Sequence, residues 1–354
     1  MLPRIDYPEL ILEVNARTGF LDAMPHISGS LARRDDLDLS LAALLVARSC
    51  NIGLTPVAKP GTAALGESRL VGVEKGYFHG EGIGKASAIL VTKQADIGIT
   101  DTGSYSDLVY GMFAICGYQF APRHADITDT QMWWIDVAML RGEITRDHRG
   151  SNGWGAFNEL QLRRVSVPAI LEHWDDMVRV AGSLSTNKVR AYDLIKMMTA
   201  DGRLTGLGNA FAAYGRIFKT LHLLQIIHVE SYRRMIGTQL NTGESRHQLA
   251  RRVFFGNLGQ LRQSYERGME NQLGALGLGL NAITWWNSLY IDAAVARLEA
   301  GGPGISHEIK ARLSPLLFEH INFHGSYPFH RPHLEEGRLR ELRDPGAVDD
   351  EPEE

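Results

Sequence analysis

Sequence patterns typical of β-strands occur in only one short stretch of this chain, and this limits the folds that the chain can adopt. Residues 97–100 form a short apolar strand that ends at Asp101. Ser104 or Ser106 can then cap a helix, and residues 118–121 return as a second strand. A crossover through a helix of this size is typical of parallel strands. The pattern therefore predicts a single β-α-β unit.

The helix inside this unit has apolar residues at helical spacing. We expect its buried face to consist of Leu108, Val109, Met112, Phe113 and Cys116. Cys50, the other cysteine of the chain, also lies in an apolar run. Both thiols are interpreted as small buried apolar groups rather than as a disulfide or a metal site.

Helical periodicity dominates the rest of the chain. Helices are expected over residues 37–49 and, despite three glycines, over residues 77–94. Beyond residue 165 the helical pattern is almost continuous. Further helices are predicted near residues 168–182, 188–199, 206–227, 229–240, 244–255, 258–275 and 279–299. With 354 residues, the chain is long enough for one large or two ordinary domains.

Charge is unevenly distributed along the chain. The net charge of −4 excludes a uniformly basic nucleic-acid-binding protein. Residues 216–267, however, contain nine basic side chains against three acidic ones, a local excess of six positive charges. This excess indicates either an ordinary solvated helical surface or a surface that contacts DNA. The segment from Asp344 onward is acidic and contains two prolines, which predicts a disordered tail.

No targeting or membrane segment is recognisable. The N-terminus does not resemble a signal peptide, and no uninterrupted run of about 18 apolar residues occurs. We therefore expect a soluble cytoplasmic protein that does not associate with a membrane.

Two carboxylates are candidates for chemistry. Asp101 lies at the carboxyl end of a strand, where open α/β sheets place ligands, although an Asp there also commonly caps a helix. Glu244 follows Asn241, and these two residues could form a capping pair at the start of a helix. The same helix would place His247 and Arg251 on the face of Glu244, an arrangement that also suits a metal and phosphate site.

Several ordered segments together carry a resemblance to a known family. The chain resembles the carboxy-terminal part of Tn-three family transposases, which move DNA by replicative transposition. The matching segments are LPRIDYPELILEV (2–14), LAALLVARSCNIGL (41–54), TDTGSYSDLVYGMF (100–113), GYQFAPRHADI (117–127), EHWDDMVRVAGS (172–183), YGRIFKTLHLL (214–224), LNTGESRHQLAR (240–251), WWNSLYIDAA (285–294) and LSPLLFEHINFHGSYPF (313–329).

The resemblance implies a ribonuclease-H-like catalytic domain in which two Asp and one Glu bind Mg²⁺, or Mn²⁺, for two-metal phosphoryl transfer. Asp101 in TDTGSYSD resembles the second Asp of the family, and Glu244 in LNTGESRH resembles its Glu. The helical stretch between them is consistent with an insertion before the Glu-bearing helix. The implied partner is double-stranded DNA, at both transposon ends and target. Self-association and a location at the bacterial nucleoid are further expectations.

Basic residues near Glu244 are the expected DNA contacts. They are Arg216, Lys219, Arg246, His247, Arg251 and Arg252. The expectation combines the local charge excess with the family resemblance.

One departure from the family bears on activity. Members have a segment with a SADG-like motif, which carries the first catalytic Asp, between the helix matched by ASAILVTKQAD (86–96) and the TDT strand. Here Asp96 leads through residues 97–99 directly into Thr100 and Asp101. Relatives are also longer, with DNA-binding domains ahead of the region matched here. The sequence therefore predicts a catalytic region with an internal deletion that does not cleave DNA alone.

Two other hypotheses remain open. The chain could be a DNA-binding or oligomerising remnant without catalysis. It could also be a stand-alone metal-dependent nuclease that uses Asp101, Glu244 and a further acid such as Asp107 or Asp126. Salt-sensitive binding without cleavage would favour the first hypothesis.

The predicted fold class is a mixed α/β remnant of a ribonuclease-H-like fold, dominated by helices, with a large helical insertion before the Glu-bearing helix. We expect a helical region over residues 1–96, the sheet remnant with Asp101 over 97–130, a mainly helical part over 131–330, and an acidic disordered tail over 331–354. Two strands are too few for an independently stable sheet. Residues 97–121 are therefore expected to open more readily than the helical part.

Overall fold

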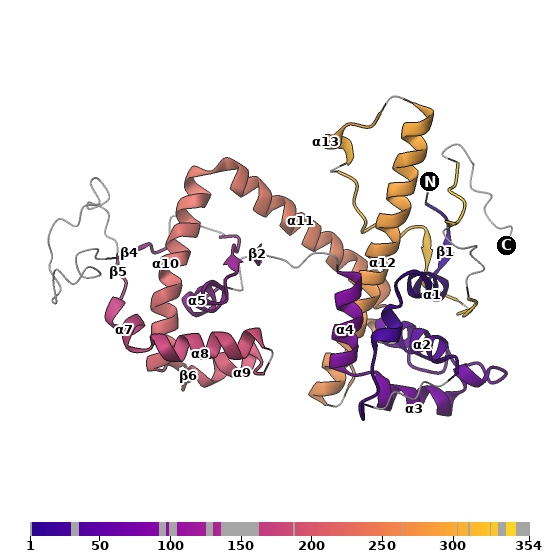
Figure 1. The fold of residues 1–354 in the computed structure, drawn as a ribbon, viewed down its shortest axis with the longest axis horizontal. Helices are drawn as coiled ribbons and strands as arrows, with labels where there is room; N and C mark the ends of the chain where they lie inside the picture. Colours follow the sequence, from indigo (N-terminus) through magenta and orange to yellow (C-terminus); the bar gives the residue numbers. More distant parts are fainter. Residues whose placement is uncertain are drawn as a thin grey trace. The chain divides into compact units, whose positions relative to one another are not determined.

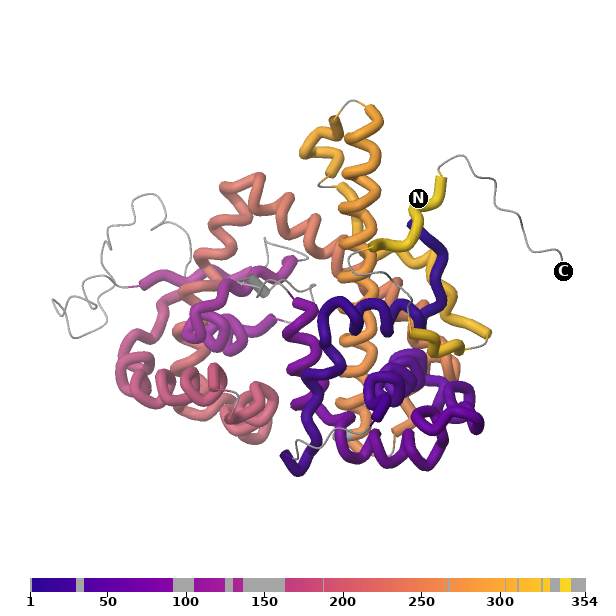
Figure 2. Tube along the Cα trace, turned by 45° about the vertical axis from the view of Figure 1, so that its right-hand side comes forward, coloured from indigo at the N-terminus to yellow at the C-terminus, as the bar shows by residue number. Residues whose placement is uncertain are grey.

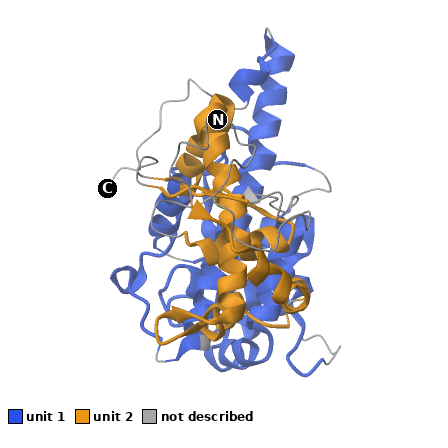
Figure 3. Cartoon of the chain, turned by 90° about the vertical axis from the view of Figure 1, so that its left-hand side faces the viewer, with its two compact units in different colours: residues 1–94, 244–354 blue, residues 95–243 orange. Residues whose placement is uncertain are grey.

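The computed structural model describes residues 2–29, 35–91, 97–98, 105–124, 130–135, 163–186, 188–263, 265–302, 304–310, 312–325, 327–331 and 338–344. The chain divides into two compact units, shown in Figure 3. Unit 1 consists of residues 1–94 and 244–354, and unit 2 of residues 95–243. The predicted four-part division along the sequence stays a prediction, and the compact units differ from it by joining the two ends of the chain.

Helices dominate both units (Figure 1). Unit 1 contains β1 (Ile5–Asp6), α1 (Tyr7–Thr18), η1 (Phe20–Ala23), α2 (Leu37–Ser49), η2 (Ala63–Leu65), α3 (Glu67–Tyr77), α4 (Gly80–Leu90), η4 (Gly256–Gly259), α12 (Glu266–Gly301), α13 (His307–Lys310) and β8 (Ile321–Asn322). Unit 2 contains β2 (Ile97–Gly98), α5 (Asp107–Ile115), β3 (Gln119–Phe120), β4 (Trp133–Trp134), β5 (Arg163–Arg164), α7 (Val167–Glu172), α8 (Trp174–Ser185), α9 (Ala191–Met197), β6 (Thr199–Ala200), β7 (Arg203–Leu204) and α10 (Gly206–His228). Helix α11 (Glu230–Val253) begins in unit 2 and ends in unit 1.

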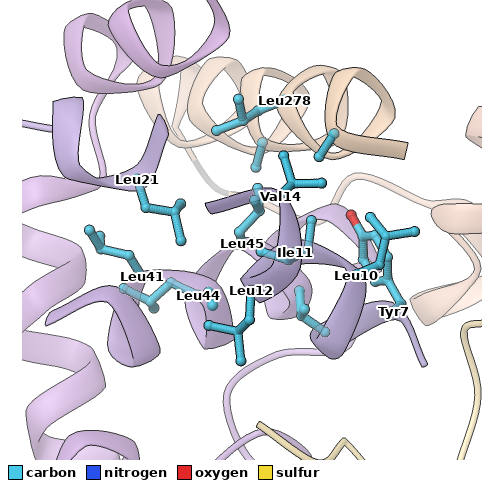
Figure 4. Packing of buried hydrophobic residues seen from close by; sticks show 14 of the residues in the cluster. Tyr7, Leu10, Ile11, Leu12, Val14, Leu21, Leu41, Leu44, Leu45 and Leu278 are labelled. Atoms are coloured by element: carbon cyan, nitrogen blue, oxygen red, sulfur yellow. The ribbon is translucent and has the colours of Figure 1, made fainter. Parts of the chain in front are cut away.

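The core of unit 1 is built from helices that are distant in sequence. Helices α1, α2 and α4 each contact α12, and the N-terminal helices lie beside it in Figure 2. Figure 4 shows buried side chains of these elements gathered in one cluster, among them Leu10, Leu44 and Leu278. Helix α1 ends where Gly19 adopts a φ of 67°, a left-handed conformation that suits glycine.

A polar group inside this core ties down the C-terminal segment. The Glu13 side chain is fully buried and accepts hydrogen bonds from Tyr290 Oη at 2.7 Å and Arg340 Nε at 2.8 Å. Leu339 and Leu342 pack against the same core. The prediction of a disordered tail beginning at residue 331 is therefore wrong for residues 338–344, because a buried carboxylate needs the charged partner that Arg340 supplies.

The predicted β-α-β unit is confirmed in unit 2. Strands β2 and β3 pair in parallel, with Ile97 opposite Gln119, and α5 lies between them in sequence. Ser106 is the N-cap of α5, and its Oγ accepts a hydrogen bond from Val109 N at 3.3 Å. Gly117 ends the segment with a φ of 81°.

Helix α5 buries a different face from the predicted one. Leu108 and Met112 are buried as expected, and they pack with residues of α8, α9 and α10. Val109, Phe113 and Cys116 are only half-buried, whereas Tyr110 and Gly111 are buried. The shift arises because α10 packs against the helix at Gly111, where a Cβ atom would lie 2.1 Å from Phe211 O.

Several predicted helix boundaries are wrong. The helix expected over residues 77–94 is α4, which begins at Gly80 and ends at Leu90, and the helix expected near 168–182 is divided into α7 and α8. Asn241 and Glu244 lie inside the continuous helix α11, so they do not form a cap between two helices. The helices expected over 258–275 and 279–299 are one helix, α12, preceded by the short turn η4. By contrast, α2 and α10 occupy the predicted ranges almost residue for residue.

The prediction of a helix-dominated chain with few strands is confirmed for the described part. The strands form four two-stranded pairs, three parallel and one antiparallel. Assignment to a ribonuclease-H-like sheet stays a prediction. Among the described helices, none is long and apolar enough to cross a membrane.

Candidate functional site

Glu244 lies on an exposed part of α11. Its side chain is 58% exposed, and Oε1 accepts a hydrogen bond from Arg251 Nη2 at 2.9 Å. His247 Nδ1 lies 3.8 Å from Oε2. The structure therefore brings together the three residues that were expected to share one helix face. Arg251 therefore contacts one oxygen of the carboxylate, and His247 lies nearer the other.

Asp101, the other predicted catalytic residue, lies outside the described residues, as does Asp126. The expected approach of the Asp101 and Glu244 carboxylates stays a prediction. The two residues belong to different compact units, with Asp101 in unit 2 and Glu244 in unit 1.

Arg216 and Lys219 form a partly buried charge cluster in unit 2. Arg216 Nε donates to Asp107 Oδ2 at 2.9 Å, and Lys219 Nζ donates to Asp107 Oδ1 at 3.1 Å. The Arg216 guanidinium also lies over the ring of Trp133, 4.0 Å from its centroid. One carboxylate thus engages two of the predicted DNA contacts, and the same pairing occupies Asp107, the acid considered for a stand-alone nuclease.

The other predicted DNA contacts lie on α11 and differ in accessibility. Arg246 is half-buried and donates to Asn281 Oδ1 at 2.7 Å, and burial lowers the pKa of its guanidinium. Arg251 and His247 are 71% and 77% exposed. Arg252 is also exposed and has no ion pair among the described residues. These three residues are exposed to solvent, whereas Arg246 is half-buried.

A buried cluster of aromatic and imidazole groups in unit 2 was not anticipated from the sequence. Tyr110 Oη lies 3.1 Å from His124 Nε2, and His222 bonds to Tyr232 Oη and to the carbonyl of Pro122, both at 2.9 Å. Burial, with help from His222 and Lys219, lowers the pKa of His124 to about 4. Burial also lowers the pKa of His222 and raises that of Tyr110. No short motif could have revealed this cluster, because its members come from α5, α10, α11 and the segment after β3.

No group of three or more His, Cys, Asp or Glu side chains that could hold a metal ion occurs in the described ranges. In the same ranges, the ion-pair neighbours of the Glu244 carboxylate are Arg251 and His247. The described residues by themselves therefore do not fit a two-metal site, which requires several oxygen ligands around each ion.

Comparison with known proteins identifies relatives over most of the chain. The family model described as "Tn3 transposase DDE domain" matches residues 9–100 and, in a second segment, residues 93–327. The transposase for transposon Tn4556 of Streptomyces fradiae is 37% identical over 434 aligned residues, covering 99% of this chain and 47% of that protein.

Two further relatives also match nearly the whole of this chain. The transposase for transposon gamma-delta of Escherichia coli (strain K12) is 33% identical over 427 residues, covering 97% of this chain and 41% of the relative. The transposase for transposon Tn1546 of Enterococcus faecium is 27% identical over 415 residues, covering 93% of this chain and 40% of the relative. The chain spans less than half the length of these curated relatives.

Proposed function

Because the chain belongs to the family of Tn3 transposases, which the DDE-domain match and the relatives establish, we propose that it is a part of a transposase catalytic region that binds duplex DNA but does not cleave DNA by itself. The observation that carries this proposal is the family match from residue 9 to residue 327, interrupted near residues 93–100.

An internal gap in the chain explains why the family model matches it in two segments. The two matched segments meet and overlap at residues 93–100, the pattern expected where a stretch of the family model has no counterpart in the chain. The alignment with the Tn4556 transposase is 434 residues long, whereas the whole chain has 354. At least 80 residues of that relative therefore have no counterpart in this chain. This supports the loss of a segment at the place where the sequence predicts the first catalytic Asp to be missing, between Asp96 and Ile97.

The surroundings of Glu244 agree with binding rather than cleavage. Its carboxylate shares its face with Arg251 and His247 and accepts a hydrogen bond from Arg251 at 2.9 Å. Divalent metals serve DDE transposases in general, but the described residues here do not supply the ligands for them. No metal-dependent step is therefore assigned to these residues.

We assign DNA contact to the exposed basic residues of α11. Arg251, Arg252 and His247 are accessible, and Arg251 can contact a phosphate while it still touches Glu244. Such contacts release counterions and do not depend on base sequence. We therefore expect weak, salt-sensitive and sequence-independent binding of duplex DNA.

A restored chain tests the proposal. The chain itself should bind a duplex in fluorescence anisotropy but should not nick supercoiled plasmid with Mg²⁺ or Mn²⁺. Insertion of the aligned segment of the gamma-delta transposase between Asp96 and Ile97 should restore nicking, and Asp101→Ala or Glu244→Gln in the restored chain should abolish it. Metal-dependent nicking by the unmodified chain that disappears in Asp101→Ala would refute the proposed loss of cleavage.

A further inference from the structure

Unit 1 contains a cavity of about 380 Å³ beside the N-terminus of α12. Its lining comes from α2, α3, the start of α12 and the segments next to them, and it includes Arg48, Lys75, Tyr265, Gly268 and Gln272. This volume lies in the range of about 300–1,000 Å³ that is usual for small-molecule sites. Neither the candidate carboxylates nor the basic residues near Glu244 line it.

Gln272 presents a fixed and unused hydrogen-bond acceptor in this lining. The residue is 2% exposed, and its Nε2 donates to Asn51 Oδ1 at 2.6 Å. Asn51 cannot be turned around, because its Nδ2 donates to the carbonyls of Gly256 and Gln260 at 2.8 and 2.9 Å. Gln272 must therefore donate to Asn51 through Nε2, and its Oε1 is left buried without a hydrogen-bond partner. A buried acceptor of this kind is stabilised by a ligand that brings an N–H or O–H group.

Tyr265 supplies an aromatic face at the same cavity. The side chain is exposed, and its ring lies close to the first turn of α12, where a Cβ atom at Gly268 would come within 3.0 Å of the ring atoms Cε2 and Cζ. A larger residue at position 268 would push the ring away from the helix backbone. An exposed tyrosine ring can stack on a planar ligand, and it has few side-chain torsions to lose in doing so.

Positive charge completes the lining. The α12 helix is 36 residues long, and its N-cap residue makes no side-chain hydrogen bond to the first turn. Lys75 is exposed and has no ion pair among the described residues, whereas Arg48 is paired with Glu74. A helix N-terminus beside a lysine favours a phosphate group.

From these features together we infer that the cavity holds one unstacked nucleotide, with the base against Tyr265, a donor of the base on Gln272 Oε1, and the phosphate toward Lys75 and the start of α12. The inference rests on the proposed function, since a protein that handles DNA can take such a nucleotide from a distorted strand. A free nucleotide has the same chemistry, so the source has to be tested separately.

The test compares two 20-base-pair duplexes in fluorescence anisotropy, one fully paired and one with a single base opposite an abasic site. The second duplex should bind more tightly, because its base is already unpaired. Stacking of one base contributes about 1–3 kcal/mol, so Tyr265→Ala should weaken binding of this duplex by about 5-fold to 150-fold and remove the preference. Tyr192→Ala is the matched control, since Tyr192 is 66% exposed in unit 2 and Tyr265 is 62% exposed.

Further measurements separate the alternatives. Gly268→Ala should displace the Tyr265 ring and reduce the preference for the duplex with the abasic site, although alanine favours the helix. In a separate experiment, 5-iodouracil opposite the abasic site should crosslink to Tyr265. Equal binding of the two duplexes by the wild-type chain without any Tyr265-dependent binding of dAMP, or an unchanged preference in Tyr265→Ala, would overturn the inference. Salt-sensitive binding of the paired duplex would in either case leave the proposed function intact. Tyr265-dependent binding of dAMP without any preference between the duplexes would assign the cavity to a free nucleotide and exclude the DNA source.

Discussion

The crossing of α5 and α10 provides the sharpest test of how unit 2 is held together. At this point the helices touch through their backbones: a Cβ atom at Gly215 would lie 1.8 Å from Asp107 O and 2.5 Å from Gly111 N. An ordinary contact begins at 3.4 Å. Gly215→Ala therefore requires the two helices to separate by roughly 1.5 Å, because neither backbone atom can rotate away as a side chain can.

The size of the effect follows from opposing contributions. Overpacking usually costs about 1–3 kcal/mol, and a clash between two backbones belongs at the upper end of that range. Separation would also loosen Leu108 and Phe211, which pack across this crossing, and a gap of 0.5–1 Å already forfeits about a quarter to a half of a dispersion contact. Replacing glycine by alanine in a helix returns up to about 1 kcal/mol. We expect a net loss of at least about 2 kcal/mol in the free energy of unfolding of unit 2.

Urea unfolding followed by hydrogen exchange of peptides from unit 2 would measure this loss. With a slope of about 1–3 kcal/mol per molar urea, the unfolding midpoint should fall by roughly 1 M. Gly182→Ala in α8 is the matched control, because a Cβ atom there meets nothing within 4 Å. That variant should be slightly more stable than the wild-type chain. If Gly215→Ala behaves like Gly182→Ala, the close crossing does not exist in solution and the argument fails.

Three further predictions concern single groups. Unit 2 should lose up to about 3 kcal/mol of stability as the pH falls from 6.5 to about 4, because His124 stays neutral in the native state while the unfolded chain takes up the proton. Urea unfolding at pH 7, 5.5 and 4 should show this loss, and His124→Gln should make the stability of unit 2 less dependent on pH. Asn51→Ala should destabilise unit 1 by about 2–4 kcal/mol in urea unfolding, since it removes four side-chain hydrogen bonds and leaves a non-glycine residue at a φ of 59°. Unchanged stability would contradict the network around Gln272. The double change Arg251→Ala and Arg252→Ala should reduce the slope of log affinity for duplex DNA against log salt by about 1, because Arg252 has no ion pair among the described residues whereas Arg251 is already paired with Glu244; an unchanged slope would leave these arginines as surface residues.

The features that sequence predicted well are those set by neighbouring residues. The β-α-β unit is defined by a serine that caps the helix, a glycine that ends it, and two short apolar runs. Each of these features depends on residues only a few positions apart in the chain. The same holds for α10, which begins after the cap of Thr205, whose Oγ1 accepts from Gly208 N at 3.2 Å.

The errors come from local patterns that packing overrides. Asn241 and Gly243 are typical of a helix end, but α11 continues because Ile236 is buried in a cluster of unit 2 and Leu249 and Val253 in the core of unit 1. A cap contributes about 1 kcal/mol, and a helical glycine costs about as much, which is less than the burial of these side chains returns. In α12, Gly279 resembles a helix breaker, yet a Cβ atom there would lie 2.2 Å from Tyr7 Oη. The glycine is a packing requirement that only the tertiary structure reveals.

The sequence predicted which residues lie together at the candidate site, but not which of its charged side chains are already paired with one another. Sequence could place Glu244, His247 and Arg251 on one helix face, because helical spacing alone determines this. It could not show that Asp107 engages Arg216 and Lys219, since these residues are brought together only by the crossing of α5 and α10.

This distinction decides what the local charge excess means. A cation that already neutralises a carboxylate releases little additional counterion when DNA arrives, so the nine basic residues of the 216–267 region cannot each contribute about 0.9 to the salt slope. Asp107 holds two of them, and Arg234 is bound to Glu230 at 2.6 Å. A measured slope near 8 would mean that these ion pairs open on binding and that DNA reorganises unit 2. A slope of 2 or 3 would mean that α11 presents its few exposed cations to DNA while the Asp107 cluster keeps its structural role.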